Sequence, residues 1–276
     1  MQSFSLKKGC VHNLIADQAR HLNNEACSMF PELTLFYLMA AIVALIIGLS
    51  KGGLGGTLGA LATPLMALVM PADQVIGLVL PVLMLADVFA VALHWRRWNA
   101  RLVWLLIPGS ILGVTVGTFF ITNAPTRTLQ VALGVIILLF ALYRIFETRI
   151  VGSFKYRPHD WHGLLAGTIT GFSSALAHTG GPPVSIYLLM QEVTPRVFIA
   201  TSAVFFLILN WIKVPYYFYA DLFDFQLLMR IAWLLPLVPA GVWVGRWAAG
   251  RVNKQTFEWV IIGLLILTAG MLIAGL

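Results

Sequence analysis

Charged residues are scarce in this chain, and their scarcity excludes the water-soluble globular classes. Asp, Glu, Lys and Arg make up 11% of the 276 residues, whereas hydrophobic residues make up 59%. The mean hydropathy is +0.88, and a soluble globule, in which about 25% of residues are charged, could not cover its surface with this composition. We therefore expect the lipid bilayer to be the solvent for most of the chain.

Cysteine is almost absent, which leaves a disulfide scaffold or a cysteine-based metal site with little support. The two cysteines, Cys10 and Cys27, both precede the first apolar run. Whether they form a bridge with each other remains open. The residues around them are polar and mixed and lack the apolar region of a signal peptide, so we interpret residues 1–32 as a polar tail.

Catalytic constellations are missing as well. The sequence shows no paired carboxylates, no histidine cluster with metal-ligand spacing and no nucleophile beside a base. His159, Asp160 and His162 are close in sequence, but this pattern is more typical of a solvated helix start. We expect no enzyme, no cofactor and no metal. The net charge of +7 does not predict a nucleic-acid partner, because Lys and Arg lie mainly in short gaps between apolar runs.

The apolar runs are continuous rather than alternating, which favours helices over a β-barrel. We predict an all-α polytopic membrane protein. Ten apolar segments are expected at about 33–49, 57–70, 74–94, 102–121, 128–146, 162–177, 183–191, 197–219, 226–247 and 255–275. At a rise of about 1.5 Å per residue, the segments 57–70 and 183–191 are too short to cross a hydrocarbon core of about 30 Å. These two are predicted to be broken or re-entrant short helices near the midplane.

The distribution of Lys and Arg predicts the orientation. Basic residues concentrate in the gaps 94–101, 144–157 and 246–254, and such gaps lie on the cytoplasmic side. This assignment places both chain termini outside, together with the short connections at 71–73, 122–127 and 220–225.

The order of landmarks predicts two related halves of inverted topology. Residues 48–51 match residues 171–174 at an offset of about 123 residues, and the same offset sets Asp87 against Asn210. Each half holds five segments, an odd number, so the second half enters the membrane from the opposite side. The predicted parts are the tail (1–32), a first transmembrane repeat (33–147), a basic cytoplasmic linker (148–161) and a second transmembrane repeat (162–276).

Each half contains an interruption rich in Gly or Pro at a corresponding position, and transporters built from inverted repeats bind their substrate at such breaks. The first break covers residues 50–57 and the second covers 173–183. Helix N-termini at the breaks would offer unpaired N–H groups and partial positive charge to an anion. The predicted substrate-binding residues are Lys51, Gly52, Gly53, Gly55, Gly56, Thr57, His178, Thr179, Gly180, Gly181 and Pro182. The predicted proton-coupling or path-lining residues are His178, Asp87 and Asn210.

Structural alternatives stand beside these roles. Gly-rich stretches and the spacings Gly113-x-x-x-Gly117 and Gly241-x-x-x-Gly245 also serve close helix packing. Lys51 could extend to the membrane interface. Asp87 and Asn210 could instead form an interhelical hydrogen bond.

The motifs, taken in order, are Gly-Leu-Ser-Lys-Gly-Gly-Leu-Gly-Gly at 48–56, Thr63-Pro64-Leu65, Leu80-Pro81, Gly171-Phe172 and Gly180-Gly181-Pro182-Pro183. With the central basic loop, this order resembles the TauE/SafE (TSUP) family of sulfite exporters over roughly residues 33–275. The resemblance implies transport of small anions, chiefly sulfur oxyanions and organosulfonates such as sulfite, thiosulfate or sulfoacetate, coupled to the proton gradient. Lys51 and the glycines of both breaks match the family's motifs, whereas the role of His178 is inferred from its chemistry.

We therefore predict a secondary transporter of small anions that works by alternating access. The alternatives are an anion channel, a carrier of another small carboxylate or anion, and a non-transporting membrane scaffold. The expected location is the bacterial cytoplasmic (inner) membrane, as a multi-pass protein. Its expected partners are a small anionic substrate and the lipid bilayer, with no nucleic acid, and a homodimer is compatible with the sequence.

Overall fold

The computed structural model of the protein describes residues 34–54, 56–153, 159–248 and 251–275. The predicted tail, both cysteines, Gly55 and part of the predicted linker lie outside the described residues. The chain divides into two compact units, Met1–Met39 and Ala40–Leu276. The second unit holds the second predicted repeat and residues 40–147 of the first, and the packing described below is internal to it.

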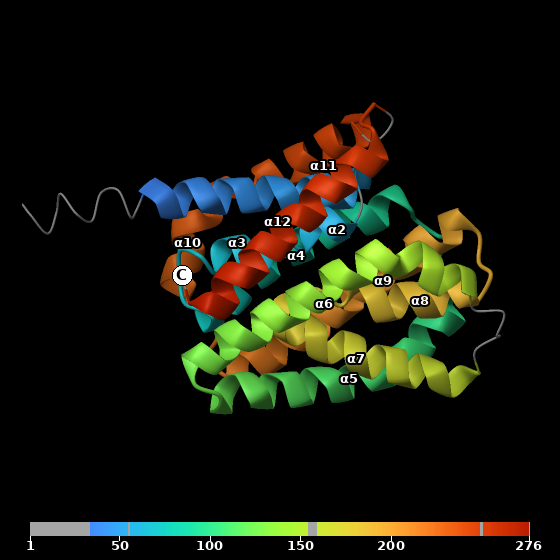
Figure 1. The fold of residues 1–276 in the computed structure, drawn as a ribbon, viewed down its shortest axis with the longest axis horizontal. Coiled ribbons are helices and arrows are strands. Elements are labelled where there is room, and N and C mark those ends of the chain that lie inside the picture. Colours follow the sequence, from blue (N-terminus) through green and yellow to red (C-terminus); the bar gives the residue numbers. More distant parts are fainter. Residues whose placement is uncertain (1–33, 55, 154–158, 249–250, 276) are drawn as a thin grey trace, which may run out of the picture. The chain divides into compact units, whose positions relative to one another are not determined.

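The described residues form helices and turns without any strand (Figure 1). The first helix is Thr34–Gly53, and it ends in a π-helical turn, η1, Ser50–Leu54. The helices that follow are α2 (Gly56–Gly59), α3 (Ala62–Met66), α4 (Ala72–Leu93), α5 (Ala100–Asn123), α6 (Thr126–Ser153), α7 (Asp160–Ala177), α8 (Gly181–Met190), α9 (Pro195–Tyr219), α10 (Phe225–Ile231), the 3₁₀ turn η2 (Ala232–Leu234), α11 (Leu237–Ala248) and α12 (Lys254–Ala274).

Six of these helices are long and apolar enough to cross a membrane: Thr34–Gly53, α4, α5, α6, α9 and α12. The pair formed by α10 with η2 and α11 would add a seventh span if it crosses as one bent unit. The two segments predicted to be short are indeed short apolar helices, at Thr57–Met66 and Gly181–Met190. The prediction of an all-α polytopic membrane protein is confirmed, while its division into two inverted repeats stays a prediction.

The segment predicted at 226–247 is not one continuous helix. It is bent by 47° between Leu234 and Leu237, and Pro236 lies inside the break. Proline lacks the N–H that would bond to the carbonyl one turn earlier, and its ring clashes with that carbonyl. Pro108 leaves α5 continuous, so proline alone did not predict where the chain would break.

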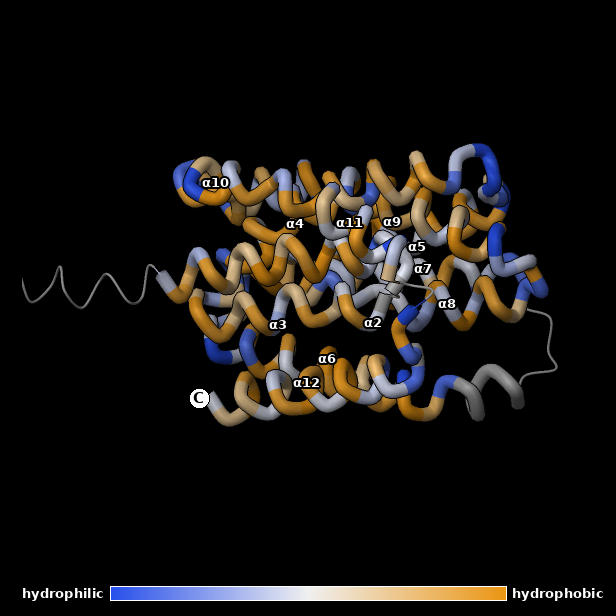
Figure 2. Tube along the Cα trace, turned by 90° about the horizontal axis from the view of Figure 1, so that it is seen from above, coloured by the Kyte–Doolittle hydropathy of each residue, from blue (hydrophilic) through white to orange (hydrophobic). Residues whose placement is uncertain are grey.

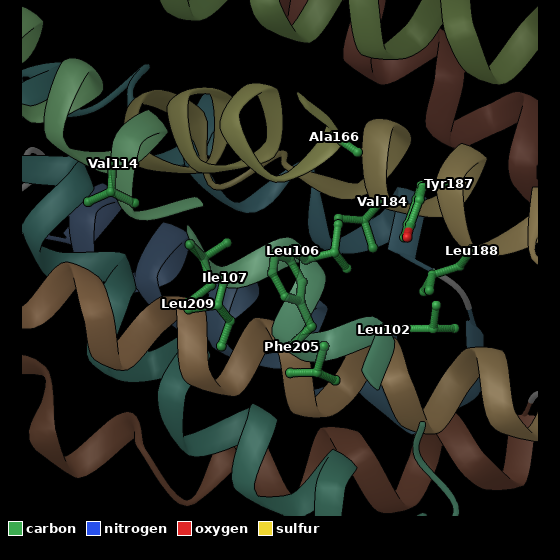
Figure 3. Packing of buried hydrophobic residues seen from close by; sticks show 11 residues of the cluster. Leu102, Leu106, Ile107, Val114, Ala166, Val184, Tyr187, Leu188, Phe205 and Leu209 are labelled. Atoms are coloured by element: carbon green, nitrogen blue, oxygen red, sulfur yellow. The ribbon is translucent and has the colours of Figure 1, made fainter. Parts of the chain in front are cut away.

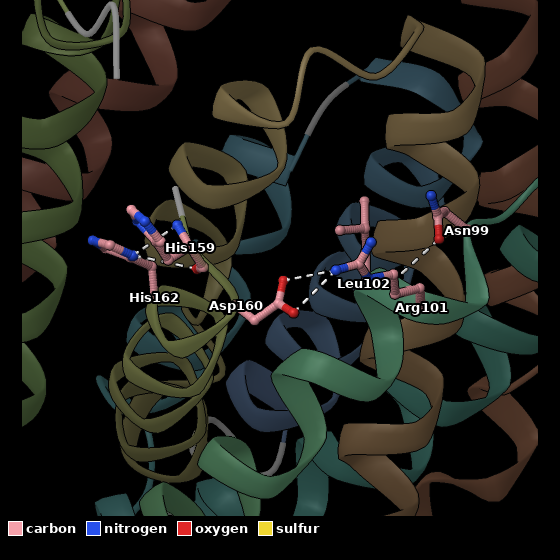
Figure 4. A network of polar contacts seen from close by, with 6 residues as sticks. All are labelled: Asn99, Arg101, Leu102, His159, Asp160 and His162. Atoms are coloured by element: carbon pink, nitrogen blue, oxygen red, sulfur yellow. Dashed lines mark hydrogen bonds and ion pairs between the residues drawn. The ribbon is translucent and has the colours of Figure 1, made fainter. Parts of the chain in front are cut away.

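The basic gaps gather at one end of the helices. Arg101 donates two hydrogen bonds to the carboxylate of Asp160, at 3.1 and 3.0 Å, which ties the start of α5 to the start of α7 (Figure 4). Arg144 near the end of α6 pairs with Glu258 near the start of α12 at 2.9 Å. Hydrophilic colours accordingly concentrate at the ends of the helices in Figure 2. That this end faces the cytoplasm, with both termini outside, stays a prediction.

The His159, Asp160 and His162 constellation is a helix start, as we interpreted it. His159 precedes α7, and its backbone N–H donates to Nδ1 of His162 at 3.0 Å (Figure 4). All three residues are exposed or half-exposed, and the carboxylate of Asp160 pairs with Arg101. The constellation therefore stabilises the N-terminus of α7.

Helices from the two halves of the chain pack against each other closely. Helix α5 lies along α7, and α11 lies along the end of the first helix at η1. A Cβ atom on Gly113 would stand 2.7 Å from the backbone N of Phe172, and one on Gly241 would stand 2.8 Å from the backbone O of Leu45. The two Gly-x-x-x-Gly spacings therefore serve helix packing. This reciprocal contact is what two interlocked repeats would produce.

A buried apolar cluster holds α5, α7, α8 and α9 together. Leu106 of α5, Val184 of α8 and Phe205 of α9 are fully shielded and lie beside one another in Figure 3. Dense packing of such side chains resists deformation. The cluster therefore holds α8, which follows the second break, against the long helices α5 and α9.

Candidate functional site

The first break is a departure from α-helical geometry at residues 50–54. Gly53 has a φ of 132°, a conformation that residues with a side chain rarely adopt. Gly52 approaches α11 closely, because a Cβ there would stand 3.0 Å from the backbone N of Arg246. Gly52 thus has a packing role, and Gly53 permits the turn.

The helix after the first break is too short to act as a strong dipole. Helix α2 contains only Gly56–Gly59 before the chain turns, and a macrodipole needs several aligned peptide units. Thr57, in this turn, is buried. Positive charge at the first break must therefore come from Lys51 rather than from a helix end.

Lys51 points into the protein instead of toward a membrane interface. Its Nζ lies 2.5 Å from Oδ1 of Asp87 on α4, and the Lys51 side chain is 23% exposed whereas that of Asp87 is 0% exposed. The same Nζ lies 5.3 Å from the ring centroid of Phe206 on α9. The alternative in which Lys51 extends to the interface is thus wrong for this structure.

Asp87 also contacts the residue with which the repeat offset aligned it. Nδ2 of Asn210 donates a hydrogen bond to Oδ2 of Asp87 at 2.6 Å, where α4 packs against α9. Asn210 is 4% exposed. The interhelical hydrogen bond that we considered is present, and it leaves both side chains beside the first break.

Lys213 is a further candidate site residue, which the sequence analysis did not select. It lies one turn beyond Asn210 on α9, it is fully buried, and its Nζ donates to Oγ and the backbone O of Ser174 at 3.1 and 3.3 Å. An ionisable residue within an apolar run is the signal that could have found it, because such residues in membrane segments are costly and usually functional.

The second break follows α7, and His178 makes the turn. His178 has φ 55° and ψ 22°, in the left-handed region, and its N–H donates to the backbone O of Ser174 at 3.1 Å. This conformation is uncommon for a residue with a side chain, and such strain clusters at functional sites. Among the described residues, neither ring nitrogen of His178 has a hydrogen-bond partner, although both are shielded.

The chain re-enters a helix directly after His178. Helix α8 begins at Gly181 with Pro182 in its first turn, and it runs for ten residues. Proline suits this position, since its missing N–H would have no partner there. The Oγ1 of Thr179 is buried and has no hydrogen-bond partner in the described part of the chain. Gly180 packs against Thr170, whose Cγ2 would lie 2.7 Å from a Cβ at that position.

The contacts above, together with one turn of α9 between Asn210 and Lys213, form a row of polar residues between the two breaks. The row runs from Lys51 to Asp87, across to Asn210, along one turn of α9 to Lys213, and then to Ser174 at the end of α7. We call these five residues the polar path. It contains two lysines and one carboxylate, so cationic groups outnumber anionic ones. Such an arrangement can hold a small anion.

The structure brings some of the predicted site residues together and leaves others apart. Lys51, Asp87 and Asn210 are in direct contact, and the polar path connects them to the α7 end that carries His178. Gly55 lies outside the described residues. Binding of an anion by any of the predicted residues stays a prediction.

Comparison with known proteins gives one match. The family described as "Sulfite exporter TauE/SafE" matches residues 40–272, which include both breaks and every residue of the polar path. The searches of curated proteins and of solved structures found no match.

Proposed function

We propose, from the premise that this chain belongs to the TauE/SafE family of sulfite exporters, that it carries small sulfur oxyanions or organosulfonates by alternating access. The family is one of membrane anion transporters, and the chain is a multi-pass membrane protein. Sulfite, thiosulfate and sulfoacetate are the substrates that we would test first. The proposed location is the bacterial cytoplasmic membrane.

The polar path is the observation that carries this proposal. Ionisable groups inside a membrane protein are costly, face the interior and mark substrate pathways. Here Lys51 and Lys213 lie inside the helices with one carboxylate, Asp87, between them. One carboxylate does not balance two lysines, and a bound anion would supply the second negative charge.

The second break supplies further donors for the same anion. Helix α8 has ten residues, so its dipole adds partial positive charge beside the Thr179 hydroxyl, although Pro182 and Pro183 leave only Gly181 and Val184 with an N–H in its first turn. His178 offers two ring nitrogens that lack partners among the described residues. In our proposal the anion binds between the two breaks, and His178 takes up a proton with it and releases that proton on the other side.

The direction of transport decides how much the proton contributes. Moving one charge across a membrane involves about 2.3 kcal/mol per 100 mV. Export of an anion from a negative interior is therefore downhill, whereas uptake needs a proton or another ion. Rocking of the two halves around the breaks would expose the site to each side in turn.

The test is flux of radiolabelled sulfite, thiosulfate and sulfoacetate in liposomes that contain the purified protein. We expect Lys51→Ala to lower flux at least about tenfold, since an unsatisfied charged partner costs more than 1.4 kcal/mol. His178→Ala should remove the dependence of flux on a proton gradient. Arg101→Ala and His162→Ala are the matched controls, because both residues are exposed at the helix ends.

The same liposomes separate a carrier from the alternatives. A carrier saturates and is accelerated by unlabelled substrate on the opposite side, whereas a channel is not accelerated and a scaffold gives no flux. Unchanged flux in both Lys51→Ala and His178→Ala would discard the proposed site.

A further inference from the structure

Lys51 is the cation that the proposed anion site needs, yet in the structure it is already paired with Asp87. Asp87 is fully buried and both of its carboxylate oxygens are engaged, Oδ1 by Lys51 at 2.5 Å and Oδ2 by Asn210 at 2.6 Å. An anion that binds Lys51 must therefore compete with a carboxylate held within the protein. A lysine that served only to attract the anion would not need a buried carboxylate as its partner.

A carrier meets a second requirement after it releases its substrate. It must return through the same conformational change with an empty site, and a buried charge without a partner is strongly disfavoured. If Lys51 lost its anion and had no replacement, the empty protein would be held on the side where release took place. Asn210 anchors the carboxylate of Asp87 within reach of Lys51, and this provides the replacement.

We propose that Asp87 is an internal substitute for the substrate: it neutralises Lys51 in the empty carrier and is displaced when the anion binds. This inference rests on the proposed function, and it concerns how the same site is regulated. When the anion replaces Asp87 at Lys51, the ring of Phe206, 5.3 Å from Nζ of Lys51, stays close to the cation, and Nδ2 of Asn210 stays the hydrogen-bond donor to the displaced carboxylate. Asp87 therefore makes net transport feasible, because the empty carrier can return.

The charge count leads to a specific expectation for Asp87→Asn. This change adds one positive charge to every state of the carrier. If His178 stays neutral, the variant with a monovalent anion bound carries the same charge as the empty wild type, so it can reorient. Without the anion, it carries one more positive charge than any wild-type state. The count holds whether Lys213 is charged or neutral, because Lys213 is present in all the states compared.

The experiment compares two modes of flux in one preparation of liposomes, with radiolabelled sulfite as the probe and the membrane potential clamped. A mildly acidic buffer keeps bisulfite, the monovalent form, predominant. Net efflux into anion-free buffer requires return of the empty carrier, whereas exchange against unlabelled sulfite does not. In a His178→Ala background, in which no proton accompanies the anion, we expect Asp87→Asn to lower net efflux at least about tenfold more than it lowers exchange.

Three further variants complete the design. Asp87→Glu keeps the charge and should retain net efflux. Asp87→Ser removes the charge with less bulk and is a second uncharged variant if Asp87→Asn folds poorly. Asp160→Asn is the matched control, because it removes a carboxylate that is also paired with a basic residue but is 60% exposed.

The ratio of the two modes decides the outcome. If net efflux falls no further than exchange in both uncharged variants, the inference is overturned, including when both modes are lost together. Wild-type protein that moves none of sulfite, thiosulfate and sulfoacetate in either mode would instead overturn the proposed function. The two failures are therefore distinguishable.

Discussion

The two breaks occupy corresponding places in the chain, yet they acquire positive charge in different ways. In the first break the lysine is on the break itself and its acidic partner, Asp87, is on the long helix α4. In the second break the acceptor, Ser174, is on the helix that precedes the break, and the lysine comes from the long helix α9. The first cation is neutralised by a carboxylate, whereas the second is held by neutral oxygens.

Two breaks at corresponding places in the chain can therefore have lysines with different electrostatic roles. A paired cation can be released and re-formed during a transport cycle, because its partner remains beside it. A lysine held by a hydroxyl and a carbonyl, as Lys213 is, has no carboxylate that competes with a bound anion. We therefore expect substitutions at Lys51 and at Lys213 to affect stability differently, although both should lower transport.

The largest effect should come from the two lysines compared directly. Lys51→Met leaves the buried Asp87 without its cation, and we expect the free energy of unfolding to fall by about 3 kcal/mol. This value is at the low end for a broken buried pair because the Lys51 side chain is 23% exposed. Lys213→Met replaces a buried cation with an apolar side chain of similar volume, so stability should be retained or raised. Thermal unfolding of the purified variants in detergent measures both.

The double variant Lys51→Met with Asp87→Asn is the control for this comparison. It removes both charges, so most of the lost stability should return. Equal losses in Lys51→Met and Lys213→Met would show that the two cations are equivalent after all.

An intermediate effect on stability is expected from one glycine in each break, Gly52 in the first and Gly181 in the second. A Cβ on Gly52 would collide with the backbone of α11, and we expect Gly52→Ala to cost about 2 kcal/mol, as overpacking typically does. A Cβ on Gly181 would meet only Cε2 of Phe140, at 3.7 Å, so Gly181→Ala should leave the unfolding temperature nearly unchanged. Similar shifts in both variants would contradict the view that Gly52 is tightly packed against its neighbour whereas Gly181 is not.

The smallest effect should come from the helix ends, away from both breaks. Asp160→Asn removes an exposed ion pair with Arg101, and such pairs contribute about 0–1 kcal/mol. Its unfolding temperature should lie close to that of the wild type, and the little that is lost should vanish at high salt. A large shift would mean that the junction of α5 with α7, and not the polar path, governs stability.

Much of the fold was predictable from the sequence, because the membrane constrains it strongly. Continuous apolar runs predicted the long helices, and run lengths predicted the two short ones, which the structure confirms. The bend at Pro236 was not predicted, since Pro108 lies within α5 without breaking it. Whether a proline interrupts a helix depends on the neighbours that satisfy the freed backbone groups.

The candidate site was predictable only in part. The break residues and the alignment of Asp87 with Asn210 came from spacing along the chain, and the second pair proves to be in contact. Lys213 was not among the predicted residues, although it lies within an apolar run. The ion pair that neutralises Lys51 was not predicted, because Asp87 had been considered only for helix packing or for the transport path.

Composition and the spacing of apolar runs by themselves determined that this chain is a polytopic helical membrane protein with two interrupted segments. These properties follow from local hydrophobicity and chain length, which need no knowledge of neighbours. Only the tertiary structure decided which polar groups meet, since packing brings Lys51 of η1 to Asp87 of α4 and brings Lys213 of α9 to Ser174 of α7. The energetic effect of a buried charge depends on its partner, and the packing of the helices determines which partner it has.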